Sequence, residues 1–195
     1  FNPDLGPPQS GVDKAVQSLL LPHNHRYSSS QGIAKLRQAF AEWYNRRFGV
    51  SIDPEHEVVV TQGTKEGLAH LLLAVANPGD HILVPTPSYP IHNSSVIMSA
   101  ASLLGIPLFS SWDEADSAGY SLNGDSADFF ARLESVCSSA WPKPRAMIVN
   151  FPHNPTGTVV DQSFFERLVT FARSKQILLI HDFAYAELCY DGYQA

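Results

Sequence analysis

The segment Ala146-Met147-Ile148-Val149-Asn150-Phe151-Pro152-His153-Asn154-Pro155-Thr156-Gly157-Thr158 joins a short apolar strand to a turn with two prolines and a glycine. Four apolar residues in succession predict a strand that is covered on both faces of its sheet. The two X-Pro bonds and Gly157 interrupt the regular backbone after that strand. We therefore expect Asn150 and Asn154 to point outward from the edge of the sheet.

The alternation of strand and helix continues on both sides of this segment. Toward the C-terminus we expect a helix over 161–175, capped by Asp161, and a strand over 177–180. Toward the N-terminus we expect strands over 58–60 and 82–84, an apolar segment over 101–109, helices over 65–76, 91–100 and 126–140, and a polar loop over 110–125. This order predicts an α/β fold with a largely parallel sheet whose core lies in residues 57–195. Ligands of such sheets bind beyond the carboxyl ends of the strands.

The first residues have a different character. Prolines and Gly6 predict an extended arm over residues 1–10, followed by a short helix that ends before Pro22 and a polar loop. From Gly32 the apolar spacing predicts a helix with an aromatic face that Gly49 closes. We divide the chain into an arm with its loop, residues 1–30, and a domain that begins at residue 31.

Composition restricts the classes of protein and partner. Of the 195 residues, 44% are hydrophobic and 16% charged, which is typical of a folded globular chain. The net charge of -6 disfavours nucleic acid as a partner, and the most apolar run, Leu68 to Ala76, contains His70 and is too short to span a membrane. The start shows no signal peptide, and Cys137 and Cys189 predict buried apolar thiols in a reducing, cytoplasmic setting. The pair His23 and His25 has no third metal ligand and is expected to be exposed.

Two strand ends carry residues suited to a ligand. The turn Thr61-Gln62-Gly63-Thr64-Lys65-Glu66-Gly67 opens a helix, and its amides, glycine and hydroxyl suit a phosphate group, although ordinary capping is an alternative interpretation. Three neighbouring prolines hold Tyr89 at the next strand end, where its ring either stacks on a planar ligand or packs against its own loop.

Asp182 directly follows an aliphatic strand. A carboxylate in this position loses part of its solvent and requires a cationic partner. That partner is either Lys143 or Arg145 in a structural ion pair, or a protonated nitrogen of a ligand.

Taken in order, these motifs resemble the class I and II aminotransferases. The resemblance is carried by Tyr27-Ser28-Ser29-Ser30-Gln31-Gly32 with Leu36-Arg37, Gly63-Thr64-Lys65-Glu66-Gly67, Pro87-Ser88-Tyr89-Pro90, Asn154-Pro155-Thr156-Gly157 and Asp182-Phe183-Ala184-Tyr185. It runs from residue 2 to residue 195 and leaves only the segment near 109–125 without a counterpart. The sequence His181-Asp182-Phe183-Ala184-Tyr185-Ala186, followed by Tyr190-Asp191-Gly192-Tyr193, is most similar to the bacterial alanine-synthesising and diaminopimelate aminotransferase branch.

The resemblance implies the large domain of a fold type I pyridoxal-phosphate enzyme, a three-layer sandwich that is incomplete in this chain. It implies that pyridoxal 5'-phosphate binds with its phosphate at Gly63, Thr64 and Lys65, its ring on Tyr89, its phenolic oxygen at Asn154 and Tyr185, and its pyridine nitrogen at Asp182. Asp182 and Tyr185 are then also catalytic. Tyr27 matches a residue that reaches the cofactor phosphate of a neighbouring subunit, which implies a homodimer.

The reaction implied is transfer of an amino group between an amino acid and a 2-oxo acid, both small molecules. In the family, the lysine that forms the Schiff base and the arginine that binds the substrate carboxylate lie downstream of the position of Asp182. Since neither motif occurs before Ala195, we expect the chain to be an N-terminal fragment that is inactive alone. The alternatives are an effector-binding module of a transcription regulator, or a lyase or cyclase of the same fold. The amino donor and acceptor are not identified by these residues.

Overall fold

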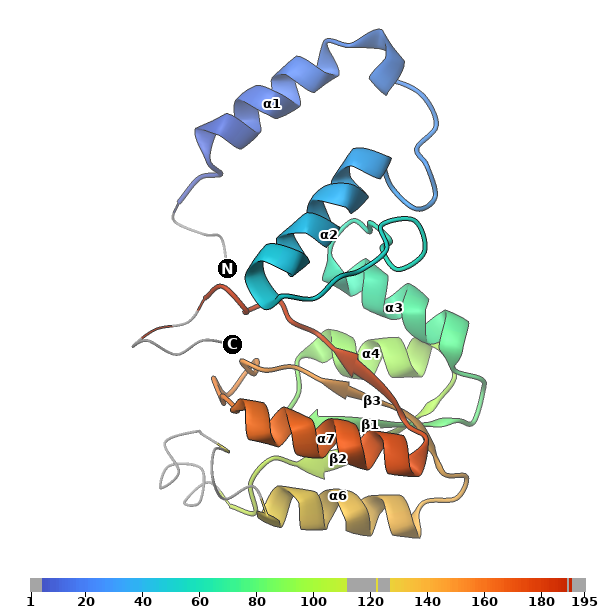
Figure 1. The fold of residues 1–195 in the computed structure, drawn as a ribbon. Coiled ribbons are helices and arrows are strands. Elements are labelled where there is room, and N and C mark those ends of the chain that lie inside the picture. The colour runs from blue at the N-terminus through green and yellow to red at the C-terminus, as the bar shows by residue number, and fades with distance from the viewer. Residues whose placement is uncertain (1–4, 112–121, 123–126, 189, 191–195) are drawn as a thin grey trace. The chain divides into compact units, whose positions relative to one another are not determined.

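The computed structural model describes residues 5–111, 122, 127–188 and 190 (Figure 1). Contacts along the chain divide it into two compact units, residues 1–61 and 62–195, which we call the first and the second unit. Each unit is described by itself.

The second unit is built on a four-stranded sheet in which all neighbouring strands are parallel. Its strands are β1 (His81–Thr86), β2 (Ser102–Pro107), β3 (Pro144–Val149) and β4 (Leu178–His181), arranged in the order β2-β1-β3-β4. The strand that follows β1 along the chain therefore lies on one side of it, and β3 lies on the other. The carboxyl ends of all four strands meet at one edge of the sheet.

Helices cover both faces of this sheet, as Figure 1 shows. The helices are α3 (Thr64–Val75), α4 (Pro90–Met98), α6 (Ala127–Ser139) and α7 (Gln162–Lys175). Alternate residues of β1 belong to different cores: Ile82 and Val84 pack with α3 and α4, whereas Leu83 packs with α6 and α7. The predicted three-layer α/β sandwich is confirmed, and with it the prediction that the central strands are covered on both faces.

Local sequence signals set the ends of several elements. Asp161 caps α7 as predicted, because its Oδ1 accepts a hydrogen bond of 2.9 Å from the backbone N–H of Phe164.

Most of the polar loop predicted over 110–125 lies outside the described residues, as does Cys189. Cys137 is buried on α6, as expected.

The first unit contains α1 (Gln9–Leu19), a short 3₁₀ helix (Pro22–Asn24) and α2 (Ala34–Phe48). Gly49 ends α2 in the left-handed conformation, with φ 67°, as its position in the sequence predicted. His23 and His25 are exposed.

Arg37 is the buried centre of the polar contacts in this unit, with 5% of its surface exposed. Its Nε donates to the carbonyl oxygen of Pro54 and its Nη1 to that of Gly32, while its Nη2 pairs with Glu55 at 2.9 Å. The guanidinium therefore ties helix α2 to the turn before it and to the loop after it.

The strand predicted over Val58–Val60 is wrong, because this segment has no place in the sheet. Val60 donates one backbone hydrogen bond of 3.0 Å to Gln31 within the first unit, and Val59 is 64% exposed. An apolar run becomes a strand only where neighbouring strands satisfy its backbone on a regular ladder. Among the described residues, one backbone hydrogen bond from Val60 to a turn takes the place of that ladder.

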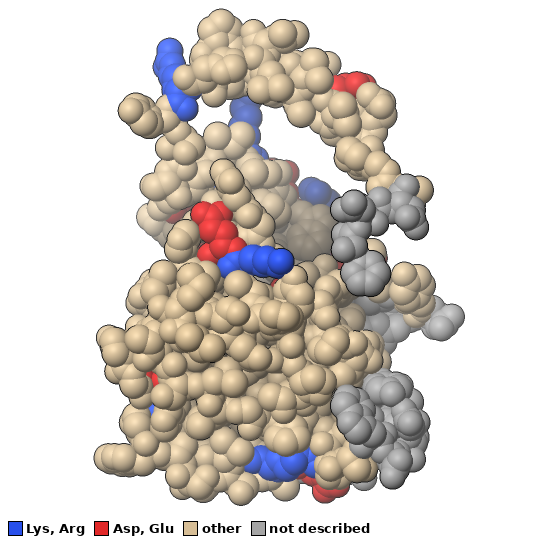
Figure 2. Space-filling view, turned by 180° about the vertical axis from the view of Figure 1, so that it is seen from behind, with Lys and Arg blue, Asp and Glu red and all other residues tan. Residues whose placement is uncertain are grey.

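Charged side chains are sparse on one face of the protein. On the face drawn in Figure 2, the Lys, Arg, Asp and Glu side chains of the described residues form small separate groups. No helix in the described part of the chain combines the length and the apolar character that crossing a bilayer requires.

Candidate active site

The chemistry-bearing residues of the second unit lie where three neighbouring strands end. Strand β1 leads to Tyr89 and His92, β3 leads to Asn150 and Asn154, and β4 leads to Asp182. The order β2-β1-β3 makes the β1/β3 boundary the point at which successive connections leave in opposite directions. In open α/β sheets a crevice forms at such a point, beyond the carboxyl ends of the strands.

The carboxylate of Asp182 is the centre of this arrangement, and its side chain is only 10% exposed. Its backbone N–H donates to the carbonyl oxygen of Val149, which fixes the residue against the end of β3 at 2.8 Å. Oδ2 lies 3.0 Å from Nε2 of His92. Since an ionised carboxylate only accepts hydrogen bonds, Nε2 carries the proton of this contact.

The other carboxylate oxygen, Oδ1 of Asp182, is buried and has no hydrogen-bond partner among the described residues. The structural ion pair with Lys143 or Arg145 does not provide a partner for this oxygen. Arg145 instead donates to the carbonyl oxygen of Val75, at the opposite end of β3, and Lys143 precedes that same end. A buried carboxylate oxygen without a partner is costly, and it fits a ligand that brings an N–H donor.

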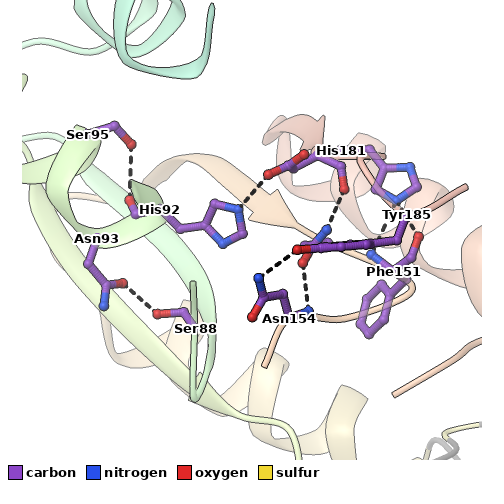
Figure 3. A network of polar contacts seen from close by, with 10 residues as sticks. Ser88, His92, Asn93, Ser95, Phe151, Asn154, His181 and Tyr185 are labelled. Atoms are coloured by element: carbon purple, nitrogen blue, oxygen red, sulfur yellow. Dashed lines mark hydrogen bonds and ion pairs between the residues drawn. The ribbon is translucent and has the colours of Figure 1, made fainter. Parts of the chain in front are cut away.

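Asn150 connects this carboxylate residue to the turn after β3, which carries Asn154 (labelled in Figure 3). Its Nδ2 donates to the carbonyl oxygen of Asp182 at 2.7 Å, and its Oδ1 accepts from the backbone N–H of Asn154 at 2.8 Å. Asn154 in turn donates from Nδ2 to the hydroxyl of Tyr185 at 2.8 Å. Three residues predicted to share a site, Asn154, Asp182 and Tyr185, are thus linked by direct hydrogen bonds through Asn150.

Tyr89 precedes α4 and is half-buried. The centroid of its ring lies 5.9 Å from that of His92 in an edge-to-face arrangement. The ammonium of Lys65 lies 5.5 Å from the centroid of the Tyr89 ring. These contacts are compatible with both interpretations of Tyr89, local packing and ligand stacking. The ring packs against the helix that it precedes, and through His92 it is also connected to Asp182. Its stacking on a ligand stays a prediction.

The contact between Lys65 and the Tyr89 ring shows that the start of helix α3 lies close to Tyr89. Gly63 occupies the N-cap position with φ 92°, a left-handed conformation that favours glycine, and it gives the helix no side-chain cap. Thr64 is the first residue of the helix, so it does not act as the cap residue, and its side chain is exposed together with that of Lys65. Glu66 accepts from the backbone N–H of Gln62. The phosphate interpretation of this turn stays a prediction.

Tyr27 belongs to the first unit and is fully exposed. Its predicted role at a neighbouring subunit therefore also stays a prediction.

Sequence reasoning missed His92, which is 2% exposed. A signal was present: His92 follows Tyr89 by three residues, the spacing that places two side chains on one helix face when a strand tip leads into a helix. It also missed His153, where burial first, and the nearby His92 second, lower the pKa to about 4. The His153 imidazole is therefore neutral at neutral pH.

A separate pocket of about 390 Å³ opens at the ends of β1 and β2 and is lined by Thr86, Pro87, Phe109, Ser110 and Ser111. None of the predicted cofactor residues is among these described lining residues. The hydrogen-bonded group around Asp182, and not this pocket, is the candidate active site.

Comparison with known proteins gives one consistent family. The model of the family described as aminotransferase class I and II matches residues 2–195. The chain is 42% identical over 194 residues to the glutamate-pyruvate aminotransferase AlaC of Escherichia coli (strain K12), a match that covers 100% of this chain and 43% of that protein. It is 40% identical to the LL-diaminopimelate aminotransferase of Moorella thermoacetica (strain ATCC 39073 / JCM 9320), covering 100% of this chain and 46% of that protein.

Among solved structures, the N-succinyldiaminopimelate aminotransferase of Mycobacterium tuberculosis is similar with a TM-score of 0.83 and 31% identity. The match covers 98% of this chain and 46% of that one. The chain thus spans less than half the length of these three proteins, all of which are named as aminotransferases and none as a regulator.

Proposed function

Because this chain belongs to the class I and II aminotransferase family, we propose that it forms the cofactor platform of a pyridoxal-phosphate-dependent aminotransferase. The whole protein would move an amino group between an amino acid and a 2-oxo acid. One observation carries the proposal beyond family membership: the buried Oδ1 of Asp182 has no hydrogen-bond partner among the residues that the structure describes, while Oδ2 of the same carboxylate contacts His92.

The residues present fit pyridoxal 5'-phosphate. A protonated pyridine nitrogen is a cationic N–H donor in a planar ring, the kind of partner that Oδ1 of Asp182 lacks within the described part of the chain. When bound, the cofactor supplies a conjugated ring that accepts the electron pair left when the substrate loses its α-proton. Asp182 holds a proton on the ring nitrogen, and His92 holds Asp182.

The remaining roles follow from the chemistry of each side chain. Asn154 and Tyr185 form one hydrogen-bonded pair, and an amide N–H and a hydroxyl both stabilise a phenolic oxygen that carries negative charge. The start of α3, with Gly63, Thr64 and Lys65, suits the phosphate, because helix amides and an ammonium attract an anion. Tyr89 would cover the ring of the cofactor.

Partners and location belong to the same proposal. Tyr27 would reach the phosphate site of a second copy in a homodimer, which we propose to act in the cytoplasm. For the substrates, the names of the relatives favour the glutamate–pyruvate pair and diaminopimelate-like amino acids.

The test is transfer of isotope by the full-length protein. The protein is loaded with pyridoxal 5'-phosphate and given ¹⁵N-labelled L-glutamate with pyruvate or another 2-oxo acid, and the products are analysed by mass spectrometry. We expect ¹⁵N in the amino acid that corresponds to the added 2-oxo acid. Absence of label from every product, with L-glutamate, L-alanine and LL-diaminopimelate each tried as donor, would contradict the proposal.

A further inference from the structure

His153 lies in the turn between β3 and α7, directly before Asn154, and only 4% of its surface is exposed. A buried imidazole is costly unless its polar atoms are paired. The contacts of this residue therefore bear on the turn that carries Asn154 into the site.

The side chain of His153 completes a network of two threonine hydroxyls. Its Nδ1 lies 2.8 Å from Oγ1 of Thr156, which also contacts Oγ1 of Thr158 and accepts from the backbone N–H of Thr158 at 3.2 Å. A hydroxyl donates one hydrogen bond and accepts two, so these three contacts use the full capacity of Thr156 with either tautomer of His153. Thr158 is fully buried, which leaves water little access to replace a lost partner.

The backbone of His153 closes the same turn. Its N–H donates to the carbonyl oxygen of Thr158 at 2.9 Å, and its carbonyl oxygen accepts from Gly157 at 2.7 Å. Asn154 follows at once and donates to the hydroxyl of Tyr185. The direction of the Asn154 side chain thus depends on a turn that His153 holds at both the backbone and the side chain.

We propose that His153 is a positioning residue, which locks the turn over 153–158 so that Asn154 stays aimed at the Tyr185 hydroxyl. This inference rests on the proposed function, in which Asn154 and Tyr185 contact the phenolic oxygen of the cofactor. A neutral imidazole suits the task, because it adds a hydrogen bond to the turn without adding a charge near His92.

The test compares three variants of the full-length protein. His153→Asn keeps a polar atom near the position of Nδ1, whereas His153→Gln places its amide near the position of Nε2, and His153→Leu removes both. If the bond to Thr156 is what matters, the Asn variant behaves like the wild type and the other two do not. Thr156→Val removes the same bond from its other side, together with the two contacts of its hydroxyl to Thr158, and serves where a His153 variant fails to fold.

The first readout is the pH at which the absorbance of the bound cofactor changes. Hydrogen bonds to the phenolic oxygen of the cofactor lower the basicity of the imine nitrogen that joins the cofactor to the protein. Misplacing Asn154 therefore raises the pH midpoint of the absorbance change. We expect a rise of about half a unit to one unit for His153→Leu, His153→Gln and Thr156→Val, the shift equivalent to one ordinary hydrogen bond. We expect the wild-type midpoint for His153→Asn.

The second readout needs no cofactor. In the apoprotein, the amides of Gly157 and Thr158 should exchange with solvent faster in the Leu, Gln and Val variants than in the wild type. An unchanged midpoint together with unchanged exchange would overturn the positioning role, and so would a loss of stability alone. A wild-type protein that does not bind pyridoxal 5'-phosphate would contradict the proposed function instead, while the exchange data would still decide whether His153 holds the turn.

Discussion

Nε2 of His92 lies 3.0 Å from Oδ2 of Asp182, so one half of a nearly buried carboxylate is held by the protein while Oδ1 has no partner among the described residues. The two residues come from different strand ends, the helix after β1 and the loop after β4. A carboxylate fixed by one oxygen keeps a defined direction for the other.

Asp182→Ala in the full-length protein should slow removal of the substrate α-proton by about three orders of magnitude. A unit charge near 4 Å contributes roughly 4 kcal/mol to keeping the ring nitrogen protonated at an effective dielectric constant of about 20. The measurement is a single-turnover reaction followed by the absorbance of the bound cofactor. Asp80→Ala is the matched control, because Asp80 accepts from Asn77 just before the start of β1, at the other edge of the sheet. If both variants react at the wild-type rate, Asp182 has only a structural role.

His92→Phe should lower kcat roughly 10- to 100-fold, the equivalent of one hydrogen bond to a charged group. His92→Gln should retain most of the activity, since the glutamine amide can place an N–H near the position of Nε2. Steady-state kinetics of the two variants, measured side by side, distinguish this role from packing. Equal losses in both variants would mean that ring shape, and not the bond to Asp182, is what His92 contributes.

The pH dependence of stability should carry a contribution from His153. Its pKa is lowered from 6.5 to about 4 in the folded protein, so between these values the unfolded chain binds the proton and the folded one does not. Stability from this residue is therefore complete above about pH 6.5 and falls as the pH approaches 4, by up to roughly 3 kcal/mol. The free energy of unfolding is measured by urea unfolding at several pH values in this range, for the wild type and for His153→Asn. It should fall less steeply with falling pH in the variant, and parallel plots of this free energy against pH would contradict the assignment.

Gly32→Ala should destabilise the protein more than Gly49→Ala, although both glycines have positive φ values of 85° and 67°. At Gly49 an added Cβ meets no atom within 4 Å, so the cost is the backbone strain alone, about 1–2 kcal/mol. At Gly32 the new Cβ would overlap the side chain of Val60, whose backbone is bonded to Gln31, and overpacking of this kind adds about 1–3 kcal/mol. Thermal unfolding of the two variants measures the difference, and similar melting temperatures would show that Val60 moves aside.

The elements that the sequence predicted well are those whose signal is local. Four of the five predicted apolar segments became strands because each is short, continuous and bounded by a turn. Gly49 and Asp161 ended and began their helices as predicted, since left-handed conformation and side-chain capping depend on single residues. Val58–Val60 failed because a strand also needs neighbours, which no local pattern can show.

The site was predictable in part for the same reason. Asn154, Asp182 and Tyr185 were found from motifs, and hydrogen bonds link them in the structure. His92 was not found, because the buried face of α4 also carries Ser95 and is too polar to mark its histidine as an inward position. The sequence also could not show that β3 lies between β1 and β4, which is the arrangement that brings the three strand ends together.

That strand order has a consequence for the newly made protein. β1 leaves the ribosome before β2 and α6, and its central neighbour β3 is made only after both of them. At about 5–20 residues per second, the nascent chain waits several seconds with β1 unpaired on that side before the half-sites of His92 and Asp182 can meet. A cofactor bound between these two residues could therefore act only on the late steps of assembly, and until β3 is made one edge of β1 has no neighbouring strand.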